Sequence, residues 1–580
     1  MRGPRRAAVA VAAVVLVGCT GLSVDTPVEA GLELGERVQP PVRVVYPGPG
    51  IDADQESIVT GFLRAGGASD GAYDVARSFL TTQAGTKWAP DSAVVVLAPG
   101  ARIRVTPVDA DTVVVTAPTS GQISATGDYV SAAPGSEARA LIDLTNEDGQ
   151  WRVSTLPEGF GRWLPEAELP RLIQPFAVYF VAEDRRTLVP DLRWFPLDRL
   201  ASRLARAQLD PVPKHLLGTV TSAVPAGTRL AGDTVVIDDG VASVNLVVTS
   251  PPDDPELRAD LVAQLVATVR QDSRVSGVKL LSNGVPVALP GAPEVTKHPS
   301  DVGLNLFVPG PAAYPVVRRG TQVRIYRSTD DESSPDAALS VSYPAVPANQ
   351  RALALSADGR ELASLDGPGV IARRWREGRE IVLPPFASSM CGPRYDRRGI
   401  VWFGGVSAAD KRTRLFVQAT SQVLSAAPAP VDVPWLVGRQ VTELSISPNG
   451  DLLAVISTDS AGRGARVDVT GIRRDANGLP QAVGGRLRLG PALTAVRGLT
   501  WVSETALATI ADGNGSTRVP TILELSGTVR SLPPLADAVR IDATSGGRAL
   551  IVGTSKGTFW LRSGAQWNSG GTGQLISAAG

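Results

Sequence analysis

Apolar and polar positions recur with three different patterns along this 580-residue chain. Between residues 49 and 168, apolar residues first recur with helical spacing, as at Ile58 and Phe62, and later alternate along β-rich stretches. The last two of these stretches, 138–144 and 150–156, flank the polar sequence NEDGQ, which predicts a hairpin turn. Residues 49–168 are therefore expected to form an α+β domain with helices packed on an antiparallel sheet.

Residues 169–290 combine amphipathic helices with short strand pairs. The stretch 256–271 carries apolar residues at every fourth position, among them Leu261 and Leu265, which is the spacing of one helix face. Strand-like stretches on both sides contain turn dipeptides such as Asn283-Gly284. This pattern predicts a second small α+β domain, with Leu261 and Leu265 in its core.

Residues 291–580 lack a strong helical pattern and repeat a polar turn followed by an apolar strand. The turns recur at intervals of 39, 40, 51, 55 and 42 residues, close to the length of one four-stranded propeller blade. This favours an all-β propeller of about six blades, with five to seven possible, over a β-sandwich with accidental spacing. A strand from outside this stretch could close the ring. The anchor positions of the turns are Gly320, Gly359, Gly399, Gly450, Thr505 and Gly547.

The expected fold class is therefore multidomain, with two N-terminal α+β domains followed by an all-β propeller. Ahead of them lies a leader in which three arginines precede an apolar run over residues 7–16. This run is shorter than the roughly 20 residues that a helix needs to span a bilayer. It fits the apolar core of a secretory signal peptide.

The end of the leader, LVGC over residues 16–19, resembles the lipobox of bacterial lipoproteins. The resemblance implies cleavage between Gly18 and Cys19, a diacylglycerol group on the thiol of Cys19, and an acyl chain such as palmitate on its freed amine. Two or more chains anchor a protein stably, whereas one chain gives only marginal binding. The alternative is an ordinary signal peptide with an incidental cysteine near its end.

These features predict a lipid-anchored protein on the extracytoplasmic side of the cell membrane. Residues 1–18 are interpreted as the signal peptide, and residues 19–48, which are rich in Gly, Pro and Glu, as a spacer from the membrane. Beyond the leader, no apolar run approaches the length of a membrane span, so the rest of the chain is expected to be soluble.

The balance of charges narrows the possible partners. The 57 Lys and Arg residues balance the 57 Asp and Glu residues, and no basic stripe is present, which argues against nucleic-acid binding. The two cysteines are Cys391 and the lipidated Cys19, so no intramolecular disulfide is expected. Cys391 lies between apolar segments and is expected to be a buried structural residue.

Candidate catalytic and metal-binding groups are few. His215 and His298 are the two histidines, both expected at the surface, and no His/Cys spacing fits a zinc site. The acidic run 329–336 lacks the ligand pattern of an EF-hand loop and is interpreted as a solvated hairpin tip. The glycine-rich stretch 567–574 is interpreted as a β or disordered tail, and no phosphate-binding glycine loop is found. No catalytic residue, cofactor site or metal site is predicted, although two carboxylates could still meet in the fold.

Several motifs within residues 178–289 resemble a known family. The stretches AVPAGTRL, VVIDDGVASVNL and VSGVKLLSNGVPV look like the GerMN domain. Together with the lipobox and LVPDLRW (188–194), they resemble the LpqB lipoproteins of actinobacteria, which implies a GerMN domain followed by a C-terminal β-propeller. The turn DPVPKHL (210–216) departs from the Gly-Pro turn and aromatic residue of the family, but its prolines still end the preceding helix.

The leading functional hypothesis is a non-enzymatic interaction protein. A propeller presents a rigid polar face, and the site rather than the fold must carry any chemistry. Resemblance to the LpqB lipoproteins implies a protein partner, the extracytoplasmic region of the sensor kinase MtrB in the MtrAB two-component system. Two alternatives remain open: an envelope enzyme or carrier that acts on cell-wall glycan through the propeller channel, and a structural scaffold in a membrane complex. A channel mouth lined by carboxylates and aromatic side chains would favour the glycan alternative.

The lipobox generates the first testable prediction. Cys19→Ala should leave the folded domains intact but abolish acylation, because no other thiol lies at the processing site. Metabolic labelling with a fatty-acid analogue measures the modification, with the unchanged protein as the control. Label retained by the variant would contradict the lipobox assignment.

Overall fold

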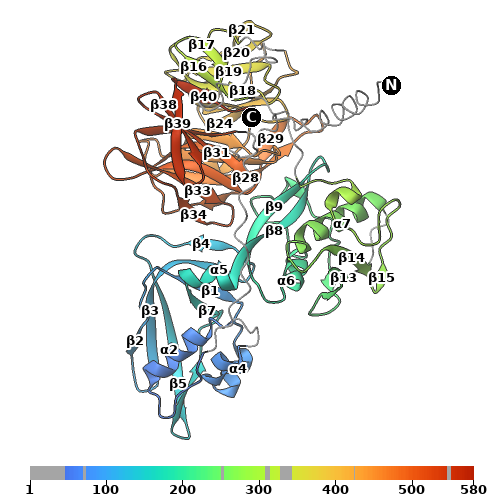
Figure 1. The fold of residues 1–580 in the computed structure, drawn as a ribbon, viewed down its shortest axis with the longest axis vertical. Coiled ribbons are helices and arrows are strands. Elements are labelled where there is room, and N and C mark those ends of the chain that lie inside the picture. Colours follow the sequence, from blue (N-terminus) through green and yellow to red (C-terminus); the bar gives the residue numbers. More distant parts are fainter. Residues whose placement is uncertain are drawn as a thin grey trace, which may run out of the picture. The chain divides into compact units, whose positions relative to one another are not determined.

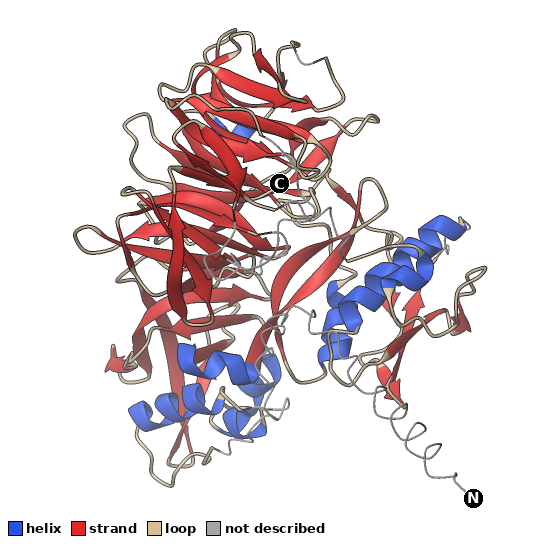
Figure 2. Ribbon diagram, turned by 45° about the horizontal axis from the view of Figure 1, so that its top comes forward, coloured by secondary structure: helices blue, strands red, loops and turns tan. Residues whose placement is uncertain are grey.

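The computed structural model describes residues 46–68, 73–249, 254–306, 314–326, 343–423, 425–544 and 550–579. The longer helices pack beside the sheets of two N-terminal α+β domains, and the following residues are built from strands and loops (Figures 1 and 2). The multidomain fold expected from the sequence is confirmed. Cys19, the acidic run 329–336 and the anchor position Gly547 lie outside the described residues.

The N-terminal α+β domain packs short helices on one seven-stranded sheet. Its elements are α2 (Gln55–Ala65), α3 (Asp74–Ser78), α4 (Thr82–Lys87), β1 (Ala93–Leu97), β2 (Arg104–Pro107), β3 (Thr112–Ser124), β4 (Tyr129–Ser131), β5 (Glu137–Glu147), β6 (Gln150–Thr155), β7 (Arg162–Pro165), η1 (Glu166–Glu168) and α5 (Leu169–Leu172). The strand order is β6-β5-β3-β1-β7, and β2 and β4 also pair with β3. The cap of α2 is Asp54, whose carboxylate accepts a hydrogen bond from the backbone N–H of Ser57 at 2.8 Å. Ile58 and Phe62 on this helix are buried in the core, as their spacing predicts.

The expectation that this sheet is antiparallel is wrong for one pair of strands. β1 and β7 pair in parallel, from Val94↔Arg162 to Leu97↔Pro165. The chain forms all the other strands of the sheet between these two and then returns to the free edge of β1 in the same direction. Parallel neighbours need such a long connection, whereas the sequence shows only local hairpin turns.

The second α+β domain combines two sheets with the helices α6 and α7. Its elements are β8 (Ile173–Ala182), β9 (Leu188–Pro196), α6 (Leu200–Ala207), β10 (Val220–Thr221), β11 (Arg229–Leu230), β12 (Val236–Asp238), β13 (Val241–Val247), α7 (Pro255–Val269), β14 (Gly277–Ser282), β15 (Val285–Pro286) and η2 (Pro299–Val302). One sheet has the order β10-β8-β9, and the other has the order β11-β13-β14-β15 with β12 beside β13. α7 connects the parallel strands β13 and β14. Leu261 and Leu265 on α7 are 4% and 0% exposed, which confirms the predicted core face.

Six sheets form the propeller in the part of the chain that the structure describes, which agrees with the expected number of blades. Grouped by sheet, the strands are β16 (Val316–Arg319), β17 (Gln322–Ile325) and β40 (Leu575–Ser577); β18 (Gln350–Leu355), β19 (Glu361–Asp366), β20 (Ala372–Arg376) and β21 (Arg379–Val382); β22 (Ala387–Tyr395), β23 (Ile400–Ser407), β24 (Thr413–Ala419) and β25 (Ala429–Val431); β26 (Gln440–Ile446), β27 (Leu452–Thr458), β28 (Arg466–Arg474), β29 (Pro480–Val483) and β30 (Leu487–Leu489); β31 (Val496–Ser503), β32 (Ala506–Asp512), β33 (Thr517–Glu524), β34 (Val529–Ser531) and β35 (Leu535–Ala536); and β36 (Ala538–Ala543), β37 (Leu550–Thr554), β38 (Thr558–Ser563) and β39 (Gln566–Thr572). The short helix η4 (Pro434–Leu436) joins two of these sheets.

Four of the recurring turns, including the one at Thr505, join the first and second strands of a blade, whereas Gly320 lies between β16 and β17 in the blade whose inner strand is β40. Gly359 lies between β18 and β19, Gly399 between β22 and β23, and Gly450 between β26 and β27. Every residue of the second strands β19 and β27 is buried, as expected for strands that have apolar neighbours on both faces. The stretch 567–574, interpreted from the sequence as a tail, includes most of β39, the outer strand of the last sheet.

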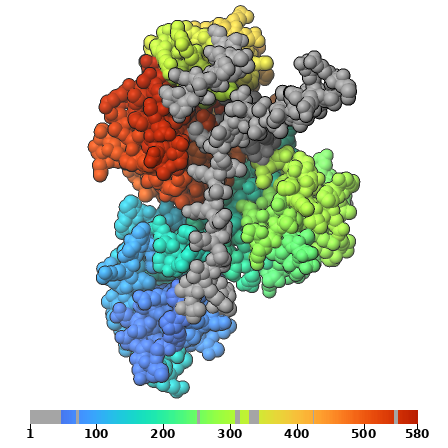
Figure 3. All heavy atoms as spheres, viewed as in Figure 1, coloured from blue at the N-terminus to red at the C-terminus, as the bar shows by residue number. Residues whose placement is uncertain are grey.

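The C-terminal strand β40 closes the ring by pairing antiparallel with β16. Leu575 is buried in one cluster with Leu353 of β18, whereas Ile576 is buried in another cluster with Phe559 of β38. The start and the end of the propeller segment, yellow-green and red, accordingly lie side by side (Figures 1 and 3). The closing strand therefore comes from the propeller segment itself, and no strand from outside residues 291–580 is needed.

Removal of residues 575–580 should open the ring and unfold the propeller cooperatively. The truncation removes the pairing with β16 and two buried side chains, each worth about 1.5–3 kcal/mol, so a loss of several kcal/mol is expected. Circular dichroism during heating and limited proteolysis of the full-length chain measure the loss. Leu575→Met, which conserves side-chain volume, is the control and should cost little. A truncated chain whose blades stay resistant to protease would show that closure is dispensable.

Candidate functional site

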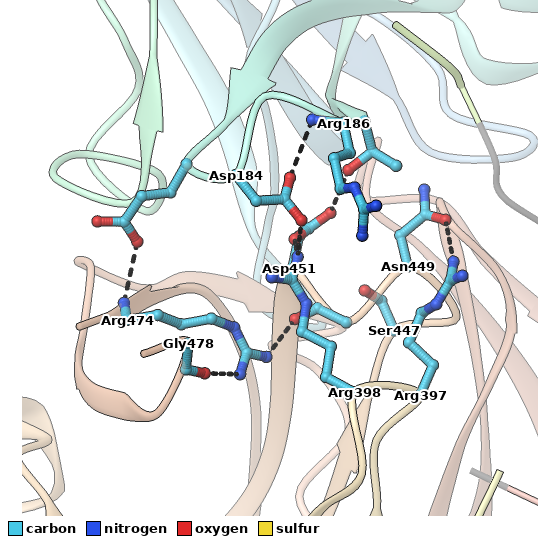
Figure 4. A network of polar contacts seen from close by, with 12 residues as sticks. Asp184, Arg186, Arg397, Arg398, Ser447, Asn449, Asp451, Arg474 and Gly478 are labelled. Carbon is cyan, nitrogen blue, oxygen red and sulfur yellow. Dashed lines mark hydrogen bonds and ion pairs between the residues drawn. The ribbon is translucent and has the colours of Figure 1, made fainter. Parts of the chain in front are cut away.

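The hairpin formed by β8 and β9, here called the docking hairpin (residues 173–196), carries a charged tip that contacts the propeller. Its two strands pair antiparallel along their length, so the tip over residues 183–187 is firmly positioned. Asp184 Oδ1 accepts a hydrogen bond from the backbone N–H of Arg186 at 3.0 Å, which fixes the turn. The other carboxylate oxygen of Asp184 faces the propeller (Figure 4).

Arg398 is the central cation of this contact. Its Nη2 atom lies 3.0 Å from Oδ2 of Asp184 on the hairpin and 2.7 Å from Oδ1 of Asp451 on the propeller. The Thr187 hydroxyl donates a hydrogen bond to Oδ2 of Asp451 at 3.0 Å. Arg398 lies between β22 and β23, and Asp451 lies between β26 and β27. The first turns of two neighbouring blades therefore receive the hairpin tip through charge-assisted hydrogen bonds.

A second arginine, Arg474 at the end of β28, holds the hairpin tip through its backbone (Figure 4). Its N–H donates a hydrogen bond to Glu183 Oε2 at 3.0 Å. Its guanidinium turns into the propeller and donates to Asp396 at 3.2 Å and to the carbonyl of Gly450 at 2.7 Å. Burial lowers the pKa of Arg474, whereas the attraction of Asp396 acts in the opposite direction. Arg474 thus braces two propeller turns and presents a donor to the hairpin.

Apolar and backbone contacts extend the interface beyond the ion pairs. Phe180 of the docking hairpin belongs to one buried cluster with Leu452 of the propeller. The backbone N–H of Gly471 donates to the carbonyl of His215 at 2.8 Å. A Cβ atom at Gly471 would lie 2.0 Å from Thr219 Oγ1, so the Thr219 side chain leaves room only for glycine here.

Glu504, between β31 and β32, places a buried carboxyl group within electrostatic reach of this network. Burial, and then the nearby charge of Asp451, raise the pKa of Glu504 to about 8. Its Oε1 atom is buried and has no hydrogen-bond partner among the described residues. Burial also raises the pKa of Asp451, although Arg398 opposes this shift. Protonation of Glu504 therefore relieves its own desolvation and its repulsion of Asp451.

The expectation that both histidines lie at the surface is wrong for His215. This residue is 6% exposed, and the loop that carries it is bonded to the propeller backbone at Gly471. Its Nε2 atom lies 3.6 Å from Asp191 Oδ1, and burial lowers the pKa of His215 despite that neighbour. His298 is exposed, as expected.

Cys391 is buried, as expected, and burial raises the pKa of its thiol. A thiol that keeps its proton is a poor nucleophile. Cys391 borders a cavity of about 280 Å³ in the propeller, together with the carboxylates of Glu443 and Asp542. No aromatic side chain is among the described residues that line this cavity. Of the carboxylates and aromatic side chains that would favour glycan chemistry, only the carboxylates are therefore found among these lining residues.

Within the described ranges of the chain, no group of three or more His, Cys, Asp and Glu side chains is arranged to hold a metal ion. No helix in that part of the chain is long and apolar enough to cross a membrane.

The sequence patterns did not identify the docking contact. The hairpin tip 183–187 and the propeller segments 396–399 and 447–451 are visible in the sequence only as turns. The available signal was the concentration of charge in EDRR and DRRG, where an ordinary turn needs only glycine, proline or a small polar residue. Such charge is also common in solvated turns, so the partners could not be assigned.

Three family models match the chain in consecutive segments. The model of the lipoprotein LpqB N-terminal domain matches residues 48–169. A model described as sporulation and spore germination, the germane domain, matches residues 177–288. The model of the lipoprotein LpqB beta-propeller domain matches residues 335–575.

Curated proteins named Lipoprotein LpqB are similar over much of the chain. The protein of Streptomyces coelicolor is 26% identical, and the alignment covers 98% of this chain and 96% of the relative. The protein of Cutibacterium acnes is 27% identical over 83% of this chain and 76% of its own length. The protein of Thermobifida fusca is 30% identical, but the alignment covers 48% of this chain and 46% of that relative.

A chain in a nidogen/laminin complex aligns with 46% of this chain at 11% identity and a TM-score of 0.33, too low to support a conclusion. The propeller is instead established by its six sheets and by the matching family model. With the N-terminal, germane (GerMN) and propeller domains matched in order, and with relatives aligned along nearly its whole length, the chain belongs to the LpqB family of lipoproteins.

Proposed function

We propose that this lipoprotein is a non-enzymatic interaction partner, held at the extracytoplasmic face of the cell membrane by lipid on Cys19. The observation that carries the proposal is the bridge from Arg398 to both Asp184 and Asp451, which joins the germane domain to the propeller. A partner protein that binds one of these two domains is thereby linked to the second domain as well. A docked pair of rigid domains suits recognition, because little conformational entropy is lost when a partner binds.

The proposed lipid anchor and spacer determine where the docked germane and propeller domains act. Acylated Cys19 holds the chain at the membrane, and residues 19–48 connect the lipid to the first folded domain. Attachment to the membrane raises the effective concentration of the folded domains near other membrane proteins. A partner in the same membrane can then be bound with modest intrinsic affinity.

The proposed partner is the extracytoplasmic region of the sensor kinase MtrB. Support for this choice comes from the family resemblance and from the membrane location, not from a particular surface of this chain. A binding protein shifts a sensor between two states only if it binds one of them more tightly. The coupled germane and propeller domains would supply such a rigid template.

Catalysis on cell-wall glycan has less support than docking. The central cavity contains the carboxylates of Glu443 and Asp542, but Asp542 is engaged by Arg394 at 3.1 Å. The thiol of Cys391 is buried and has a raised pKa. Docking to a partner therefore explains more of the observed contacts than hydrolysis of glycan does.

Arg398→Gln tests the proposed function, because it leaves the carboxylates of Asp184 and Asp451 without their shared cation. Losing charge-assisted hydrogen bonds at a partly buried site costs on the order of 1–3 kcal/mol. If the partner recognises the docked domains, its affinity should fall by about five-fold or more. The measurement is surface plasmon resonance of the full-length protein in detergent on the immobilised extracytoplasmic region of MtrB.

The matched control is Arg463→Gln, which removes an exposed arginine whose ion pair with Asp459 spans 3.9 Å. This variant should bind like the unchanged protein. Absence of binding by the unchanged protein, together with release of sugar from purified cell wall, would replace docking by the glycan alternative. Equal affinity of the Arg398 and Arg463 variants would remove the role assigned to domain coupling.

Glu504→Gln tests the electrostatics of the interface. The folded state raises the pKa of Glu504 from 4.5 to about 8, so it binds this proton more tightly than the unfolded chain does. The stability associated with protonated Glu504 is complete below pH 4.5, falls as the pH rises towards 8, and is lost above that value. Near pH 4.5 the variant should melt at the same temperature as the unchanged protein. Near pH 8 and above it should melt several degrees higher.

Thermal unfolding between the two ends of that pH range measures the difference, with Glu377→Gln on an exposed turn as the control. A difference of about 1 kcal/mol corresponds to about 2–4 °C in a domain of this size. Parallel melting curves for the unchanged protein and the Glu504 variant at every pH would contradict the assignment.

A further inference from the structure

The central channel of the propeller contains a cavity to which every blade contributes. Its volume is about 280 Å³, and its lining includes residues of the inner strands β18, β22, β26, β31, β36 and β40. Small-molecule sites have volumes of roughly 300–1,000 Å³, so the cavity is near the lower end of that range. It can accept a ligand of small size together with ordered water.

Arginine side chains give this cavity an excess of positive charge. Arg351, Arg394 and Arg540 line it, whereas Glu443 and Asp542 are its acidic side chains. Arg394 Nη1 lies 3.1 Å from Asp542 Oδ2, so these two charges offset each other. The guanidinium groups of Arg351 and Arg540 then remain, and Glu443 is the one remaining carboxylate of the lining that can balance their charge.

The guanidinium groups of Arg351 and Arg540 donate hydrogen bonds to backbone carbonyl groups. Arg540 Nη2 donates to the carbonyl of Arg351 at 3.0 Å, and Arg351 donates to the carbonyl of Met390. Neither arginine forms an ion pair with a carboxylate in the part of the chain that the structure describes. Each guanidinium has five N–H donors, so both retain donors for a further acceptor.

The pKa shifts of the neighbouring groups agree with this excess of positive charge. Burial lowers the pKa of Arg540, and the attraction of Glu443 opposes the shift. Burial, followed by repulsion from Arg540, lowers the pKa of Arg318 on β16. Burial raises the pKa of Glu443, against the attraction of the three cavity arginines. Positive charge at this point is therefore costly, and a bound anion would offset the cost.

The mouth of the channel lies away from the docking hairpin. Arg351 is the second residue of β18 and Thr442 is near the start of β26, and both are exposed. The docking hairpin instead contacts the turns that follow the inner strands, such as residues 447–451 between β26 and β27. A ligand can therefore enter without displacement of the germane domain.

We infer that the propeller channel binds a small oxyanion, a ligand that carries phosphate or carboxylate groups, beside Arg351 and Arg540. Guanidinium groups recognise both kinds of oxyanion through paired, charge-assisted hydrogen bonds. The positive excess disfavours a cation. Glu443 competes with the ligand for the same two arginines, so it limits the affinity of the site.

Isothermal titration calorimetry of the full-length protein in detergent tests this inference. The probes are inorganic phosphate and succinate, each titrated at an ionic strength held constant with chloride. One probe should bind once per chain, and Arg351→Gln and Arg540→Gln should each weaken binding by about tenfold or more. Glu443→Gln should strengthen binding several-fold. Arg530→Gln, on the exposed outer strand β34, is the matched control and should change nothing.

The two probes distinguish the source of the oxyanion. Tighter binding of phosphate indicates a phosphorylated ligand, and tighter binding of succinate indicates a carboxylate ligand; either result supports the site. Misfolding cannot imitate the gain of affinity expected for Glu443→Gln, because this change conserves the shape of the side chain. Absence of binding by both probes, or equal affinity in the unchanged protein and both arginine variants, overturns the inference. The result is independent of whether MtrB is the protein partner.

Discussion

Each blade of the propeller has two apolar faces, and closing the ring buries the faces that an open array would leave in water. β40 completes the ring because it adds Leu575 to one buried cluster and Ile576 to another, while its backbone pairs with β16. The last strand of the chain is thus held by the first strand of the propeller. Further hydrogen bonds, such as that from the Tyr326 hydroxyl to the carbonyl of Gly570, join the same two ends of the propeller segment.

Closure of the ring also creates two separate polar sites, the contact with the docking hairpin and the channel cavity. It aligns the first turns of neighbouring blades, so that Arg398 and Asp451 can meet the tip of the docking hairpin together. It also brings Arg351 and Arg540, from two different inner strands, to the same cavity. Neither arrangement exists in an isolated blade, because each depends on the angle between blades that the closed ring imposes.

Features with local periodicity could be predicted from the sequence. The turns of the blades follow from regular spacing, and the burial of Leu265 follows from the repeat on α7. The docking contact could not be predicted, because Thr187 and Asp451 are 264 residues apart and no spacing rule connects them. The same limit applies to His215, whose loop is bonded to the propeller at Gly471, far away in the sequence. The position of Arg351 in the channel likewise requires the closed ring.

The zero net charge of the chain conceals a local division of charge. At the docking contact Arg398 and Arg474 each meet carboxylates, which stabilises a fixed pairing between domains. In the channel the arginines outnumber the available carboxylates, which leaves donors for a ligand. β22 links the two regions, because it carries Arg394 into the cavity and is followed by Asp396, which accepts a hydrogen bond from Arg474 beneath the hairpin. A single inner strand therefore supplies residues to the cavity and leads into the turn that supports the hairpin contact.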